Sequence, residues 1–173
     1  MNNMKKTIFM MLGMVMFASC VNKENEFDQH LRAGLQEMAI TANMSSEVCK
    51  GVVNAWNDAI FSDNYGYNQD DINNAVQSVY SDYEEKGLFD SISVHKERMQ
   101  IEAAKIKDVP NSRKECYDDF MKMAKGVSAL SRLASNPQGS LASYSEEVNT
   151  TLDDIFSQSD EFKMKYADII AGE

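Results

Sequence analysis

One apolar stripe that keeps helical phase for more than thirty residues is the feature that most constrains this chain. On an ideal α-helix, each residue turns by about 100°. Measured from Phe27, nine later apolar residues fall within ~100° of arc on this wheel. They are Leu31, Leu35, Met38, Ala42, Cys49, Val52, Val53, Trp56 and Ile60. A new helix would have no reason to resume in the same phase, so the stripe predicts one helix over about residues 24–62.

Few helix breakers interrupt the remaining sequence. The 173 residues contain two Pro and eight Gly, and no stretch alternates with period two for long enough to be a strand. Further apolar stripes at helical spacing follow the first one. They cover residues 72–83, 88–106, 116–134 and 141–170, the last including Phe156. The pattern therefore predicts an all-α protein built from long helices.

Local signals set the expected helix ends. The apolar face rotates by roughly 150° at Gly87, which predicts a kink or break there. Pro110 is expected to end the second helix. Two S-x-x-E capping boxes, Ser112 with Glu115 and Ser143 with Glu146, are expected to start the next two helices. Because the connections are short, the sequence predicts an elongated up-down bundle of about four long helices, the second broken near Gly87.

The N-terminus has the pattern of a secretory signal. Lys5 and Lys6 precede the apolar run Thr7–Phe17. This run is shorter than the ~20 residues that a permanent membrane span needs. A positive segment followed by a short apolar segment and small residues is typical of a signal peptide.

The residues Phe17-Ala18-Ser19-Cys20 resemble a lipobox, the site at which bacterial lipoproteins are cut and lipidated. Phe17 stands where that family usually has Leu. The resemblance implies that Cys20 becomes the first mature residue, with lipid on its thiol and amine. Each buried lipid CH₂ contributes about 0.8 kcal/mol, so two or three chains anchor firmly. The alternative is an ordinary signal peptide with an incidental cysteine.

The resemblance implies three segments: a signal peptide at 1–19, a lipidated tether at 20–26, and a helical-bundle domain at 27–173. No Asp follows Cys20, and Lys23-Glu24-Asn25-Glu26 resembles the charged tag of surface lipoproteins in Bacteroidota. An outer-membrane anchor with exposure at the cell surface is therefore expected. The stretch NPQGSLASYSEEVN resembles a segment of uncharacterised helical bacterial lipoproteins, which supports the architecture alone.

The charge balance limits the classes of partner. Cleavage before Cys20 removes two Lys and no acid, so the formal charge changes from −10 to −12. Such a surface repels nucleic-acid phosphates and anionic head groups. The charge serves either solubility alone or attraction toward a basic partner.

Residue sets for catalysis or metal binding are not visible. His30 and His95 lack a partner at i+3 or i+4, and the acidic loop Asp63–Asp71 does not match an EF-hand. The sequence therefore predicts no enzyme activity and no cofactor. Cys49 and Cys116 are expected at different heights in the bundle, too far apart for a disulfide. Both lie on apolar faces, so we expect two buried, unpaired thiols.

Two weaker patterns point to specific residues. Trp56, Tyr65 and Tyr67 lie near one helix end, where they either stack on a sugar or seal the end of the bundle. Asp90-Ser91-Ile92 resembles the short O-glycosylation motif of Bacteroidota, with Ser91 as the acceptor; the alternative is a helix-start serine.

The sequence thus favours a non-enzymatic envelope lipoprotein, held in the membrane through Cys20, that binds an envelope protein or glycan. The alternative is a carrier of a small ligand, sugar or metal, near the Trp56–Tyr67 end.

Overall fold

The structure is a computed structural model. It describes the backbone of residues 2–61, 69–106 and 108–172, and the side chains of residues 23–61, 73–106 and 108–172. These residues form helices and short connections without any strand, so the predicted all-α fold is confirmed. The helices are α1 (Asn2–Phe61), α2 (Gln69–Glu85), α3 (Leu88–Lys105), the 3₁₀ turn η1 (Asn111–Arg113), α4 (Lys114–Ser135), α5 (Leu141–Lys165) and α6 (Ala167–Ala171).

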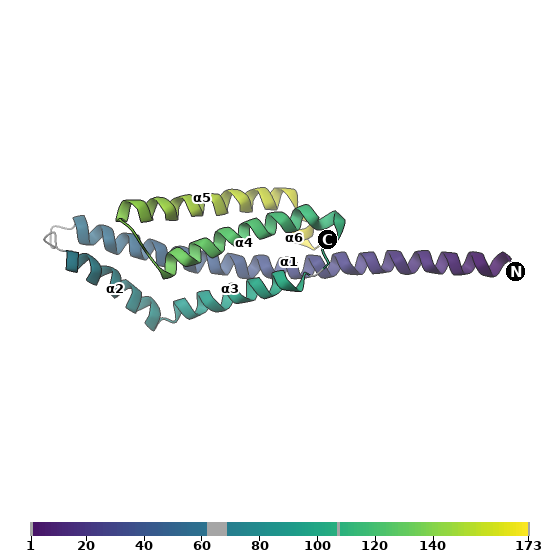
Figure 1. The fold of residues 1–173 in the computed structure, drawn as a ribbon, viewed down its shortest axis with the longest axis horizontal. Coiled ribbons are helices and arrows are strands. Elements are labelled where there is room, and N and C mark those ends of the chain that lie inside the picture. The colour runs from purple at the N-terminus through teal and green to yellow at the C-terminus, as the bar shows by residue number, and fades with distance from the viewer. Residues whose placement is uncertain (1, 62–68, 107, 173) are drawn as a thin grey trace.

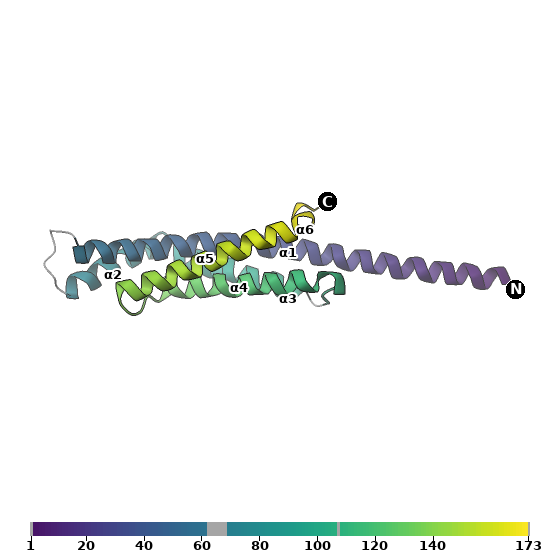
Figure 2. The same ribbon diagram turned by 90° about the horizontal axis from the view of Figure 1, so that it is seen from above.

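The helices form an elongated up-down bundle around α1. Figures 1 and 2 show α2 and α3 returning together along α1, α4 running back beside it, and α5 returning once more. The described side chains of α1 begin at Lys23, and the 39 residues from there to Phe61 span ~57 Å at 1.5 Å each. The two ends of the bundle therefore lie far apart along one axis.

The core follows the predicted stripes. On α1, Phe27, Leu31 and Val52 are buried, and on α4 Phe120 and Leu130 are buried. Each such side chain contributes about 1.5–3 kcal/mol relative to an exposed one.

Helices α1 and α4 approach each other closely at Gly34. A Cβ atom there would lie 2.8 Å from Cζ of Phe120, a contact too short for a side chain at this position. Phe120 fills the space that the missing side chain leaves.

The predicted break between the second and third helices lies at Gly87. This residue has a φ angle of 66°, in the left-handed region that favours glycine. Leu88 then begins α3 in a new direction, so the apolar face of α3 can again turn toward α1.

The capping boxes were predicted wrongly. Ser112 lies within η1, and Arg113, at the N-cap of α4, makes no side-chain capping bond. Ser140 caps α5: its Oγ accepts from the backbone N of Ser143 at 3.2 Å, and Ser143 Oγ accepts from the backbone N of Ser140 at 3.0 Å. Hydroxyls can serve at both positions of the box, so Ser143 is the third helical residue rather than the cap.

Two further expectations need correction. Helix α3 ends at Lys105, ahead of Pro110, because Ile106 already leaves the helical conformation with ψ 82°. Phe156 was assigned to the buried face of α5 but is 63% exposed, whereas its neighbour Ile155 is 8% exposed. Helix α5 lies on the outside of the bundle and buries a narrower stripe than the sequence pattern suggests.

Candidate functional site

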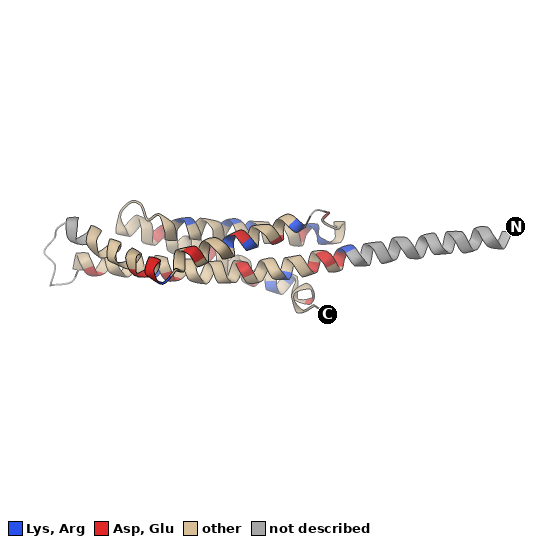
Figure 3. Ribbon diagram, turned by 90° about the horizontal axis from the view of Figure 1, so that it is seen from below, with Lys and Arg blue, Asp and Glu red and all other residues tan. Residues whose placement is uncertain are grey.

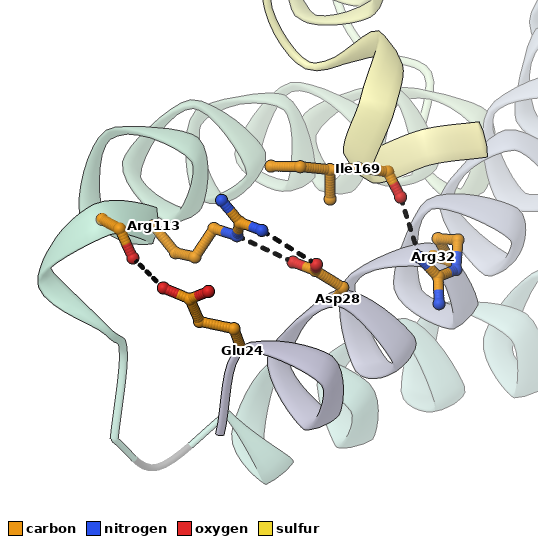
Figure 4. A network of polar contacts seen from close by, with 6 residues as sticks. Glu24, Asp28, Arg32, Arg113 and Ile169 are labelled. Carbon is orange, nitrogen blue, oxygen red and sulfur yellow. Dashed lines mark hydrogen bonds and ion pairs between the residues drawn. The ribbon is translucent and has the colours of Figure 1, made fainter. Parts of the chain in front are cut away.

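Several polar side chains join the helices at the end of the bundle nearest Cys20. We call Glu24, Asp28, Arg32, Ser112 and Arg113 the tether-end network (Figure 4). Arg113 donates from Nε and Nη2 to the two carboxylate oxygens of Asp28, at 3.0 and 3.1 Å. Ser112 donates to Glu24 at 2.5 Å, and Arg32 donates to the backbone oxygen of Ile169 at 2.8 Å.

The network fixes α1 to the start of α4 and to α6. The Arg113–Asp28 pair is bidentate and half-buried, the geometry in which such pairs are strongest. Its hydrogen bonds with Asp28 raise the pKa of Arg113 above its ordinary value. The two residues are 85 positions apart, so no local sequence pattern marks them as partners.

An open groove of about 700 Å³ lies beside the network. Its cationic side chains already have acceptors within the protein. Lys165 lies 2.8 Å from Glu161 and 3.4 Å from Asp119, and the hydroxyl of Tyr166 donates to Asp119 at 2.8 Å. The groove is therefore a polar surface whose charges are largely balanced.

Two histidine–glutamate pairs cross the contact between α1 and α3. Nδ1 of His30 lies 2.7 Å from Glu102, and Nδ1 of His95 lies 2.5 Å from Glu37. Lys105 donates to Glu102 at 2.6 Å, and mainly this bond, with that of His30, lowers the pKa of Glu102. The sequence does hold a signal for these pairs: each helix has His and Glu seven residues apart, and antiparallel packing brings opposite members together.

Hydroxyl and thiol groups cluster around the C-terminus of α4, toward the end of the bundle that lies away from Cys20. Tyr80 donates to the backbone oxygen of Ala134 at 2.6 Å, and Tyr144 to that of Leu133 at 3.0 Å. Carbonyls in the last turn of a helix lack partners within the helix, and these side chains supply them. Cys49 lies in the same cluster, where burial raises the pKa of its thiol.

Trp56 packs against this cluster. Its ring centroid lies 6.0 Å from that of Tyr144, and its side chain is half-buried. This placement agrees with the interpretation in which aromatic residues seal the end of the bundle. Tyr65 and Tyr67 lie outside the described residues.

The other predicted residues have different outcomes. Cys49 and Cys116 are buried and free, as predicted. The side chain of Cys20 lies outside the described residues. Ser91 is half-buried in the first turn of α3, and its hydroxyl donates to the backbone oxygen of Gly87 at 2.9 Å.

Ion pairs are distributed unequally along the bundle. We call the part packed around residues 23–42 of α1 the tether half, and the part around residues 43–61 the distal half. Figure 3 shows where the charged residues lie along the helices. Most acids in the tether half have cationic partners. The acids of this half without an ion pair among the described residues are Glu24, Glu26, Glu97 and Asp168. In the distal half, six exposed acids have no ion pair among the residues that the structure describes: Glu47, Asp58, Asp82, Glu84, Glu85 and Glu146.

Comparisons of the whole chain with known proteins found no matching family model, no similar curated protein and no similar solved structure. Among the described residues, no helix is both long enough and apolar enough to cross a membrane. Within the same residues, no group of three or more His, Cys, Asp or Glu could hold a metal ion.

Proposed function

We propose that this chain is a lipoprotein of the bacterial outer membrane that acts as a non-enzymatic binding module. Lipid on Cys20 holds the tether half at the membrane, and the distal half meets the partner. The observation that carries this proposal is the unequal distribution of ion pairs along the bundle. Acids that already have partners stabilise the fold, whereas exposed acids without partners remain available for another molecule.

The position of the anchor supports this arrangement. Cys20 stands three residues before Lys23, whose side chain forms a 3.4 Å ion pair with Asp108 in the tether half. The far end of α1, at Phe61, lies ~57 Å along the same helix. A lipid at Cys20 would therefore leave the distal half facing away from the membrane.

The chemistry of the distal half favours a partner with a basic surface. Helix α2 contains no Lys or Arg, and its exposed Glu84 and Glu85 point to an acidic contact surface. Attraction between opposite charges speeds association and weakens as salt is added. A neutral glycan would bind without this dependence on salt, which separates the two kinds of envelope partner.

The anchor is tested by the Cys20→Ala variant. Wild-type protein should incorporate labelled fatty acid and fractionate with the outer membrane. The variant should stay uncleaved or be released, without label. Normal labelling and normal membrane fractionation of the variant would show that Cys20 is not the lipidated residue.

The binding surface is tested by crosslinking in cells. Wild-type protein should trap a specific partner, and Glu84→Lys combined with Glu85→Lys should lose it. The control combines Asp118→Lys with Asp160→Lys, which changes the net charge equally at exposed positions of the tether half. Equal loss of the partner in both variants contradicts a distal site. If no partner appears and the purified chain hydrolyses a test substrate, with one substitution abolishing that activity, an enzyme replaces the binding module.

A further inference from the structure

Helix α2 is docked on the bundle by less buried surface than the other long helices. None of its described side chains, at residues 73–85, is buried, and its apolar ones are only half-buried. The helices α1, α3, α4 and α5 each bury at least two side chains. Figure 1 shows α2 sloping away from α1 toward its junction with α3. Since burial of an apolar face supplies most of the stability of a helix in a protein, α2 has the least of this support.

Two tyrosines make the side-chain hydrogen bonds of α2 among the described residues. The hydroxyl of Tyr80 donates to the backbone oxygen of Ala134 at 2.6 Å, and that of Tyr83 donates to the backbone oxygen of Glu47 at 3.4 Å. Tyr83 also lies against Gly51 of α1, where a Cβ atom would overlap its hydroxyl. Docking of α2 therefore depends largely on two side chains that reach across to α1 and α4.

The charges at the end of α2 oppose its helical form. The helix contains five acids and no Lys or Arg, and three of the acids, Asp82, Glu84 and Glu85, lie in its last turn. Acids at the C-terminal end of a helix oppose its macrodipole. A helix of 17 residues is only marginally stable in water when no other element supports it. Once released from the bundle, α2 would therefore lose its helical structure.

The contact between α2 and α1 brings acids near one another. Glu47 and Asp58 lie four residues before and seven residues after Gly51, and hence on the same side of α1 as the contact with Tyr83. Burial raises the pKa of the Tyr83 hydroxyl, and the charges of Glu47 and Asp82 raise it further. No ion pair joins α2 to the rest of the described chain. Repulsion between like charges therefore opposes the docking of this helix.

From these observations we propose that α2 is an order–disorder switch, which leaves the bundle and unfolds while the other long helices stay folded. Gly87 allows this motion, because it has a φ angle of 66° and no other group lies within 4 Å of the position of a Cβ atom. Neutralising the acids of α2 favours the docked helix. This last step rests on the basic partner proposed for the distal half, and it makes binding of that partner and folding of α2 one coupled event.

Hydrogen–deuterium exchange of the full chain, prepared in detergent with Cys20→Ala, tests the opening. Separate opening of α2 predicts that amides of residues 73–85 are protected ~100-fold less than those in the interiors of α1 and α4. Tyr80→Phe should speed exchange in α2 roughly tenfold, because the docked form loses a hydrogen bond. Tyr117→Phe, in the tether half, is the control and should leave α2 unchanged. Protection of α2 equal to that of α4 overturns the switch.

Charge substitution tests the cause of the opening. Glu84→Lys combined with Glu85→Lys should slow exchange in α2 several-fold at low salt. Added salt should slow exchange in the wild type more than in this variant, because it screens the same repulsion. The control combines Asp118→Lys with Asp160→Lys, which changes the net charge equally at exposed positions and should leave α2 unchanged. Equal slowing by both pairs of substitutions would overturn the role of the acids in α2.

Pentalysine is the probe for the coupling to a basic partner. It should slow exchange in residues 73–85 of the wild type several-fold, and it should have no effect on the variant with Glu84→Lys and Glu85→Lys. If pentalysine does no more than simple salt at equal ionic strength, the switch stands and the basic partner is wrong. If α2 is as protected as α4 while crosslinking in cells still traps a partner, the partner site stands and the switch is wrong.

Discussion

The hydroxyl groups of Tyr80 and Tyr144 show how single residues support this bundle. Each donates to a carbonyl in the last turn of α4; the bond of Tyr144 is buried, and that of Tyr80 is partly buried. Replacing either tyrosine with Phe keeps the ring but leaves the carbonyl without its donor.

We expect Tyr80→Phe and Tyr144→Phe each to lower the free energy of unfolding by about 1–2 kcal/mol. Denaturant unfolding of the purified chain measures the change. Tyr117→Phe is the control, because the Tyr117 hydroxyl makes no hydrogen bond among the described residues. An equal loss in all three variants would show that ring packing, and not the hydroxyl, determines the effect.

Glu102 makes stability depend on pH. Its bonds to Lys105 and His30 lower its pKa in the folded state. A carboxyl with a lowered folded pKa stabilises the fold above its ordinary pKa, and this contribution is lost as the pH falls through that range. We expect the free energy of unfolding to decrease on acidification, and less steeply in Glu102→Gln. Glu146→Gln, at an exposed position, should keep the wild-type slope; equal flattening in both variants would contradict a special role for Glu102.

At the scale of helices, the close contact of α1 and α4 depends on Gly34. Ala is favoured over Gly inside a helix by about 1 kcal/mol, so propensity alone predicts that Gly34→Ala stabilises the protein. The new Cβ would lie 2.8 Å from Cζ of Phe120, which is fully buried, so either the ring or the two helices must shift. Overpacking of this kind costs about 1–3 kcal/mol.

We therefore expect Gly34→Ala to destabilise the bundle overall. In a double-mutant cycle, the same change should cost less in a Phe120→Leu background, because the smaller side chain vacates the contact. Thermal unfolding of the four proteins gives the coupling. Stabilisation by Gly34→Ala in the wild-type background would mean that α1 and α4 separate easily.

Helix interiors were predictable from the sequence, whereas helix ends and cross-helix contacts were not. The stripe of α1 and the break at Gly87 follow from backbone geometry within one segment. The start of α5 was misplaced because the serines at 140 and 143 can both fill capping positions. The pair Arg113–Asp28 joins residues 85 positions apart with no local pattern to mark them, so only the packing of the helices reveals it. The pair His95–Glu37 had a signal in the seven-residue spacing of His and Glu on both helices, but that signal identifies partners only once the two helices are known to pack antiparallel.

At the scale of the whole molecule, the ion-pair distribution gives the bundle two unlike halves. The tether half is held by pairs such as Lys23–Asp108 and Arg113–Asp28, while six exposed acids of the distal half have no ion pair in the described part of the chain and Glu147 alone pairs there, with Arg132. The binding module proposed above, anchored at one end and binding at the other, would use this polarity.

The shape of the molecule is the last testable consequence. The described residues from 23 to 172 form a bundle organised along α1, and a rod ~57 Å long and ~20 Å wide has a radius of gyration near ~18 Å. A compact domain of about 154 residues would instead give ~15 Å. Small-angle X-ray scattering, extrapolated to zero concentration, should give the larger value. A radius near ~15 Å would mean that the helices fold back into a shorter, thicker bundle.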